Sequence, residues 1–163
     1  MFSILIATKN EEENLPKCLE SLKDFDDIIV YDSYSEDKTR EICNRYNVRF
    51  VQRPDQNRNL PFGGDEAFHR NWALKNIKYK YKWLFILDAD ERLSKPLKQE
   101  ILEFLKLNDA QDIITPAAFR VKRRDYFLGK RLRFTQSTSK YIRLCKPNLI
   151  NYQRIINCNV EVL

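Results

Sequence analysis

The sequence is poor in the residues that mark several common protein classes. Its 163 residues include only three glycines, one histidine and one methionine, and its four cysteines form no C-x-x-C pair. A single histidine argues against a histidine-based triad or a zinc site. We expect His69 to be an ordinary residue on a helix surface or behind a site, with a single catalytic imidazole as the alternative. The scattered cysteines predict reduced thiols, which fit a cytoplasmic protein.

Long apolar runs are also absent. No stretch approaches the roughly 20 apolar residues that span a bilayer, and the N-terminal run lacks the flanks of a signal peptide. With 43% hydrophobic and 32% charged residues, the chain is neither a disordered tail nor a membrane protein by composition. We therefore expect a globule with the length of one domain.

Acidic residues become scarce toward the end of the chain. Residues 1–116 hold 18 Lys and Arg against 21 Asp and Glu, whereas residues 117–163 hold 11 against 2. The net charge of +6 thus belongs to the last third. A basic surface of this kind suits nucleic acid, an anionic membrane or a phosphorylated ligand.

The periodicity of apolar residues predicts alternating strands and helices. Short apolar runs predict strands at 3–8, 27–32, 48–52 and 84–87, and helical spacing follows each of them, most clearly after Ser94. This alternation predicts an α/β fold with a mostly parallel sheet and its ligand site at the carboxyl ends of the strands. From residue 117 onward, β-like runs predict a mixed or antiparallel part.

Three of these strand ends are unusually polar. They read IATKNEEEN, VYDSYSEDKT and LDADER, and the last places Asp88, Asp90 and Glu91 together. A D-x-D pair alone is typical of a solvated turn. Three polar ends in one α/β frame instead indicate a metal or phosphate site, because clustered carboxylates need a cation or hydrogen-bond donors. We expect Asp32 and Asp88 on the same side of the sheet, within about 15 Å of each other.

The three motifs, in order and spacing over residues 3–107, resemble glycosyltransferase family 2. The segments concerned are SILIATKNEEENLPKCLESL, VYDSYSEDKTREI and LFILDADERL. The resemblance implies the GT-A fold, a Rossmann-like α/β type, and inverting transfer of a sugar from a nucleotide donor. The later stretch RRDYFLGKRLR is similar to small enzymes of lipopolysaccharide-core or other surface-glycan synthesis.

The resemblance also implies roles for individual residues. Asp32 would accept a hydrogen bond from uracil, Asp88 would face the ribose, and Asp90 would bind Mn²⁺ or Mg²⁺. Arg70 would lie near the diphosphate, although an exposed helix arginine is an equal alternative. The nucleotide base would lie against three residues of the first loop: Thr8, Asn10 and Glu11.

An inverting enzyme also needs a general base for the acceptor hydroxyl. By resemblance the base is Glu161, although Val160 stands where relatives carry a histidine. Asp125 is the only other acid after Pro116, and its arginine neighbours favour ion pairing over proton abstraction. On this basis residues 1–163 form one nucleotide-sugar-binding domain, with a nucleotide-binding half at 1–116 and a basic acceptor-side part at 117–163 that need not be complete.

The function that this implies is metal-dependent transfer of a hexose from a UDP-sugar to a glycan, lipid-linked or protein acceptor. Nucleic acid is not expected as a partner, whereas peripheral contact with an anionic membrane stays open. Two alternatives remain: a nucleotide-sugar-binding protein without catalysis, and a basic module that binds nucleic acid or a membrane surface. A D-x-D phosphatase fits less well, because Arg92 fills the place of its usual Thr or Val.

Overall fold

The computed structural model describes residues 1–54, 64–109, 116–132, 140–153 and 159–162. Residues 109 and 159–162 are described by their backbone alone. The helices are α1 (Leu15–Glu20), α2 (Thr39–Arg45), α3 (Glu66–Asn76) and α4 (Lys95–Asp109), with a 3₁₀ turn at Pro147–Leu149. The strands are β1 (Ser3–Thr8), β2 (Ile28–Asp32), β3 (Arg49–Gln52), β4 (Leu84–Asp88), β5 (Ala118–Lys122), β6 (Tyr126–Phe127), β7 (Lys130–Arg131), β8 (Lys140–Cys145), β9 (Ile150–Gln153) and β10 (Asn159–Val162).

Six strands form one central sheet in the order β3-β2-β1-β4-β8-β5. The first four are parallel, while β8 runs antiparallel to both β4 and β5. The expected α/β class and the change to antiparallel pairing after residue 117 are both confirmed. Two small antiparallel pairs, β6-β7 and β9-β10, lie outside this sheet.

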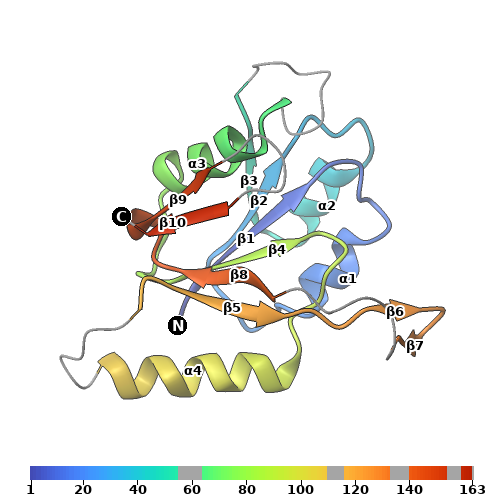
Figure 1. Cartoon of the computed structure of the whole chain (residues 1–163). Coiled ribbons are helices and arrows are strands. Elements are labelled where there is room, and N and C mark those ends of the chain that lie inside the picture. Colours follow the sequence, from blue (N-terminus) through green and yellow to red (C-terminus); the bar gives the residue numbers. More distant parts are fainter. Residues whose placement is uncertain (55–63, 110–115, 133–139, 154–158, 163) are drawn as a thin grey trace.

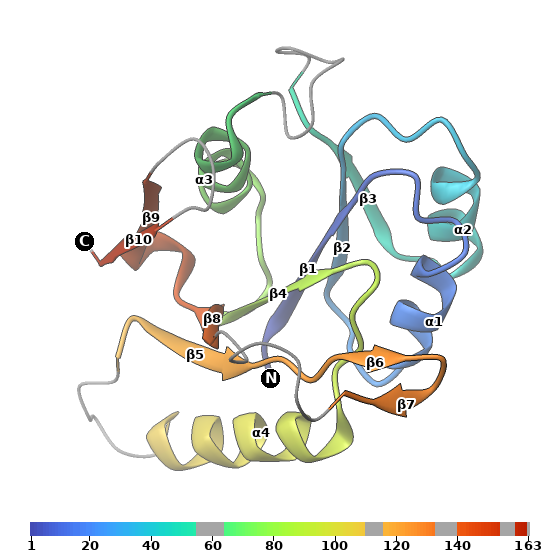
Figure 2. The same cartoon turned by 45° about the vertical axis from the view of Figure 1, so that its right-hand side comes forward.

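Helices cover both faces of the sheet (Figures 1 and 2). Side chains alternate between faces along each strand, so one face of β1 presents Ile4 and Ile6 and the other presents Leu5. Ile4 and Ile6 pack in the cluster formed with α1, α2 and α4. Leu5 packs in the cluster formed with α3 and β9. The parallel strands β1, β2 and β4 are therefore buried on both sides, which explains their continuous apolar runs.

Side chains at the helix starts set where two helices begin. The Asp65 carboxylate accepts a hydrogen bond from the Phe68 amide at 2.9 Å, which caps α3. Ser94, just before α4, accepts a longer bond from the Leu97 amide at 3.4 Å. Such caps satisfy amides that have no partner within the helix.

The single histidine and the described cysteines are buried, so His69 does not lie on a helix surface. His69 is buried on α3 and stacks on Tyr31 of β2, with ring centroids 4.4 Å apart. Cys18, Cys43 and Cys145 are free and buried, and burial raises the pKa of each thiol to about 12. Thiols that hold their protons so firmly are poor nucleophiles and metal ligands.

None of the helices in the described residues has the length and apolarity needed to cross a membrane.

Candidate active site

The acids at the strand ends gather at one edge of the sheet, as predicted. β1 lies between β2 and β4, and its last residues pair with both acids, Thr8 with Asp32 and Ala7 with Asp88. Only one strand separates the two carboxylates, which corresponds to about 10 Å across the sheet. The loops after β1, β2 and β4 therefore frame a common site.

The prediction that Asp32 and Asp88 share one side of the sheet is wrong. Paired residues on parallel strands point to the same face, and the partners Thr8 and Ala7 are neighbours on β1. Asp32 therefore follows the face covered by α1 and α2, and Asp88 follows the face covered by α3. A stagger of one residue between the two pairings produces this difference.

Asp32 is held by the turn that follows it. Its side chain accepts bonds from the Ser35 amide at 3.0 Å and the Ser35 hydroxyl at 2.5 Å, and a weak bond from Gln52 at 3.4 Å. The residue is only 1% exposed. A carboxylate can accept about four hydrogen bonds, so one acceptor position remains, and the Gln52 contact is the easiest to replace.

Thr8 lies beside Asp32 on the neighbouring strand. It is buried, and its hydroxyl has no hydrogen-bond partner among the described residues. A buried hydroxyl without a partner is unfavourable, and native structures contain few such groups. Thr8, predicted from resemblance to lie against a nucleotide base, therefore offers an unused hydrogen-bonding group at this edge.

The loops after β1 and β2 are joined by reciprocal hydrogen bonds. The Asn10 amide donates to the Ser35 hydroxyl at 2.8 Å, and the Asn10 side-chain oxygen accepts from the Glu36 amide at 2.9 Å. Farther along, the Glu12 amide donates to Asp37 at 2.8 Å, and Glu12 accepts from a backbone amide of the second loop at 3.0 Å. The two loops thus form one unit, which fixes the position of the predicted base-binding residue Asn10.

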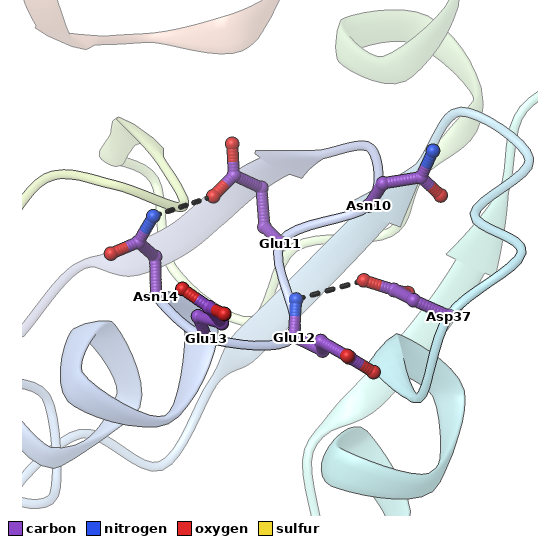
Figure 3. A pocket seen from close by; sticks show the side chains of 6 residues that line it. All are labelled: Asn10, Glu11, Glu12, Glu13, Asn14 and Asp37. Carbon is purple, nitrogen blue, oxygen red and sulfur yellow. Dashed lines mark hydrogen bonds between the residues drawn. The ribbon is translucent and has the colours of Figure 1, made fainter.

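A cavity of about 330 Å³ opens on this pair of loops (Figure 3). Glu11, another predicted base-binding residue, lines it and accepts a bond from the Asn14 side chain at 2.9 Å. Asp32 and Asp88 do not line it. Because the lining is acidic, the cavity disfavours phosphate groups and suits an uncharged part of a ligand. The lining residues are Asn10, Glu11, Glu12, Glu13, Asn14 and Asp37.

Asp88 and Glu91 are tied to an arginine that the sequence analysis did not identify. Arg143 of β8 is 9% exposed and donates to Asp88 at 2.9 Å and to Glu91 at 2.6 Å. Glu91 also accepts a bond from the Asp88 amide at 3.1 Å, which closes the turn. Burial raises the pKa of the Glu91 carboxyl, Arg143 opposes this rise, and Asp88 adds to it. The positive charge of Arg143 therefore lies against two of the three clustered carboxylates, Asp88 and Glu91.

Asp90 is the third acid of this turn, and among the described residues it makes no contact with Arg143. It is exposed, and within the described ranges it makes no hydrogen bond or ion pair. No group of three or more His, Cys, Asp or Glu that could hold a metal ion was found in the described part of the chain. A divalent ion here would thus need ligands from elsewhere, and Mg²⁺ commonly takes one or two carboxylates together with substrate phosphates.

Arg70 lies on α3, on the same face of the sheet as Asp88. It pairs with Glu66 at 2.8 Å, and its guanidinium lies 5.4 Å from the centre of the Tyr152 ring. The charge of Asp88 acts on it electrostatically. Arg70 is therefore partly buried beside the site, so the alternative of an exposed helix arginine is wrong.

Glu161 cannot be placed as a base from the structure. Its backbone lies in β10, paired with Asn151 of β9, but its side chain is outside the described residues. The strand pair is anchored to α3 because the Asn71 side chain exchanges two 2.8 Å hydrogen bonds with the Tyr152 backbone. The role of Glu161 stays a prediction. The rival acid, Asp125, is paired with Arg123 at 2.7 Å, as expected.

Comparison with known proteins agrees with the motifs. The family model described as glycosyl transferase family 2 matches residues 3–160. The lipopolysaccharide core biosynthesis glycosyltransferase LpsC of Rhizobium meliloti is 34% identical over 132 residues, 78% of this chain and 43% of that protein. An uncharacterized glycosyltransferase of Rickettsia typhi is 28% identical over 95% of this chain and 49% of its own length. The chain thus spans about half the length of these relatives or less.

Among solved structures, glucosyl-3-phosphoglycerate synthase from Mycobacterium tuberculosis, in complex with Mn²⁺ and UDP-glucose, aligns with a TM-score of 0.49 and 22% identity. The alignment covers 64% of this chain and 38% of that one. The family match is the stronger finding, since it extends over nearly the whole sequence and includes all three polar strand ends. The chain therefore belongs to glycosyltransferase family 2.

Proposed function

We propose that this chain carries the donor site of a metal-dependent inverting glycosyltransferase that uses a nucleotide-diphosphate sugar, with a UDP-sugar as the preferred donor. The observation that carries the proposal is the arrangement of the turn after β4. Arg143 occupies Asp88 and Glu91 and leaves Asp90 exposed, at the edge where Thr8 and Asp32 also lie. This places one unpaired carboxylate beside neutral and hydrogen-bonding groups, as a nucleotide diphosphate with its cation requires.

The nucleoside would occupy the side of the site nearest β1 and β2. Asp32 accepts a hydrogen bond from a base N–H in place of the weak Gln52 contact, and the unpartnered Thr8 hydroxyl supplies a second polar contact. Asn10 and Glu11 line the cavity next to them and complete the wall around the base. Asp88 lies at the end of β4, next to β1. It faces the ribose and accepts hydrogen bonds from the ribose hydroxyl groups.

The diphosphate would lie toward Asp90 and Arg70, away from the acidic cavity. Asp90 and the donor's phosphate oxygens would together hold Mn²⁺ or Mg²⁺, which fits the exposed carboxylate and the lack of a cage made by protein alone in the described residues. When bound, such an ion neutralises the charge that develops on the leaving nucleotide. Arg70 contributes a second positive charge on the α3 side.

In the transfer step, an acceptor hydroxyl approaches the anomeric carbon from the face opposite the diphosphate. A carboxylate removes the hydroxyl proton as the new bond forms, and we assign this role to Glu161. A glycan, lipid-linked or protein acceptor would be held by the basic part at 117–163, with whatever further segments the longer relatives provide. Without a working base, the same donor site would make a nucleotide-sugar-binding protein.

The first test is donor binding, measured by calorimetry with UDP in the presence and absence of Mn²⁺. Asp90→Ala should abolish the metal-dependent increase in affinity, while binding without metal stays at the level of the parent. Asp32→Asn should weaken binding with or without metal, because it acts on the base. Asp125→Ala, which removes a carboxylate outside the site, is the matched control. If Asp90→Ala still binds UDP with Mn²⁺ as tightly as the parent, the donor site is wrongly assigned.

A further inference from the structure

The hairpin formed by β6 and β7 exposes large apolar side chains. Tyr126 is 61% exposed, Phe127 is 65% exposed and Leu128 is 86% exposed. Figure 1 shows the hairpin standing out beyond the end of β5. Isolated exposed apolar residues are common, but three consecutive ones at the tip of a protruding element indicate an interaction site.

The hairpin holds these side chains outward by its own geometry. Tyr126 pairs with Arg131 and Phe127 pairs with Lys130, so a two-residue turn connects the strands. Leu128 and Gly129 form this turn with φ of 47° and 73°. Two positive φ values are typical of a type I′ turn, which favours Asn and Gly and disfavours a bulky residue. Leucine at the first of these positions is therefore unfavourable for the backbone and for solvation, which points to a function.

Basic side chains surround the apolar tip. The stretch Lys122–Arg131 contains five basic residues and one acid. The acid, Asp125, is already paired with Arg123 at 2.7 Å. Lys130 and Arg131 are exposed, and no ion pair joins them to any residue that the structure describes. The tip thus combines apolar groups that can enter a nonpolar layer with positive charges at its boundary.

We propose that the β6-β7 hairpin docks the protein on an anionic membrane surface, with Phe127 and Leu128 inserted among the acyl chains near the headgroups. Apolar insertion and attraction to anionic lipids are the two contributions that hold peripheral proteins on bilayers. Nucleic acid would meet the same charges, but it offers no apolar layer for Leu128. A membrane therefore accounts for both the basic residues and the apolar tip.

The hairpin is also connected to the candidate active site. Arg123, at its base, and Arg143, in the site, both lie over the ring of Tyr141, at 5.5 Å and 5.7 Å from its centre. The charge of Glu91 also acts on Arg123 electrostatically. A surface bound by the hairpin would consequently lie close to the turn after β4. This arrangement suits an acceptor carried in a membrane, although docking itself does not depend on the proposed function.

The test uses the whole chain and vesicles of phosphatidylcholine with or without about one third phosphatidylglycerol. The parent should sediment with the anionic vesicles and remain in solution with the neutral ones. Phe127→Gln with Leu128→Gln should lower binding by about tenfold or more, because it removes the apolar contribution. Leu107→Gln, at another exposed leucine of the described chain, should leave it unchanged.

Charge and insertion are tested separately. Lys130→Glu with Arg131→Glu should lower vesicle binding by about tenfold or more, whereas Lys75→Glu with Lys78→Glu, which changes the net charge equally, should have little effect. The fluorescence of Phe127→Trp, corrected for the parent, should shift to the blue on anionic vesicles. All measurements omit nucleotide, so they do not depend on whether the donor site works.

Three results would overturn the proposal. The first is equal vesicle binding by the apolar double variant and the parent when both show the same melting temperature. The second is equal loss in the hairpin and control charge variants, which would indicate nonspecific attraction. The third is tight, salt-sensitive binding of single-stranded RNA or DNA by the parent when the parent does not bind anionic vesicles. This result would identify the hairpin as a nucleic-acid site.

Discussion

The parallel and antiparallel parts of the sheet contribute to the candidate site in opposite ways. The parallel strands β2 and β4 end in aspartates, and acids follow β1, within residues 1–116, which have 18 basic residues against 21 acidic ones. The part from residue 117 has 11 against 2, and it sends Arg143 from β8 into the turn after β4. The acidic edge is thus completed by a charge from the basic part.

The two strand-end aspartates show the same contrast on a smaller scale. Asp32 is buried and held by Ser35, three residues away, so a local turn fixes it. Asp88, 40% exposed at its side chain, is held by Arg143, 55 residues away. A local turn can form as soon as its strand forms, whereas the Asp88 contact requires the antiparallel part to be in place.

The largest expected effect concerns an acid in the basic part. Glu161→Gln should lower the rate of sugar transfer by about 10²- to 10⁴-fold and leave the affinity for UDP and Mn²⁺ nearly unchanged, because a general base acts only on the acceptor. The measurement is transfer kinetics alongside calorimetry. Glu161 would need another role if transfer were unchanged or donor binding were lost.

A smaller effect is expected when the contact between the two parts is cut. Arg143→Met leaves the partly buried Glu91 and the half-exposed Asp88 without a counter-charge. It should lower the free energy of unfolding by about 3 kcal/mol, at the lower end for a broken buried pair because Asp88 is partly screened. It should also weaken Mn²⁺-dependent UDP binding by about 10- to 100-fold, since the turn that carries Asp90 loses its anchor.

Two further variants sharpen the Arg143 result in urea denaturation. Arg123→Met removes the other guanidinium over Tyr141. Because Arg123 is exposed and its partner Asp125 is partly exposed, the effect should stay within about 0.5 kcal/mol. Adding Glu91→Gln to Arg143→Met should recover part of the lost stability, because an amide is cheaper to bury than an unpaired carboxylate. No recovery would mean that the charge of Glu91 is not the cause of the loss.

A pH-dependent effect lies wholly within the parallel part. Burial, with Arg70 and Arg53 adding to it, lowers the pKa of His69 from 6.5 to about 4. The unfolded chain therefore binds the proton first as the pH falls. The stability that neutral His69 provides is complete above pH 6.5 and is lost as the pH falls toward 4, by roughly 3 kcal/mol in all.

His69→Phe, which keeps an aromatic ring against Tyr31, should flatten the dependence of unfolding free energy on pH between about 6.5 and 5. The measurement is urea denaturation at several pH values. The flattening should be the same in an Arg143→Met background, because the two residues make no contact with each other and distant effects add. A parent profile that is already flat in this range would contradict the burial of His69 in solution.

The sequence by itself determined the elements and the edge where the site lies. Its apolar periodicity predicted β1 with the same bounds, predicted β2, β3 and β4 to within about one residue, and identified the polar strand ends. These features depend on residues close together in the chain, so local pattern is enough to reveal them. The polar ends then had to meet, because parallel strands end on one edge of the sheet.

Only the tertiary structure decided which face each aspartate takes and what neutralises the turn after β4. The faces depend on a one-residue stagger between the pairings of β1 with β2 and with β4, which no single strand encodes. Arg143 was one of many basic residues in the last third, and only the pairing of β8 with β4 brings it to Asp88 and Glu91. Contacts of this range arise from the packing of whole strands, so the spacing of residues along the chain cannot reveal them.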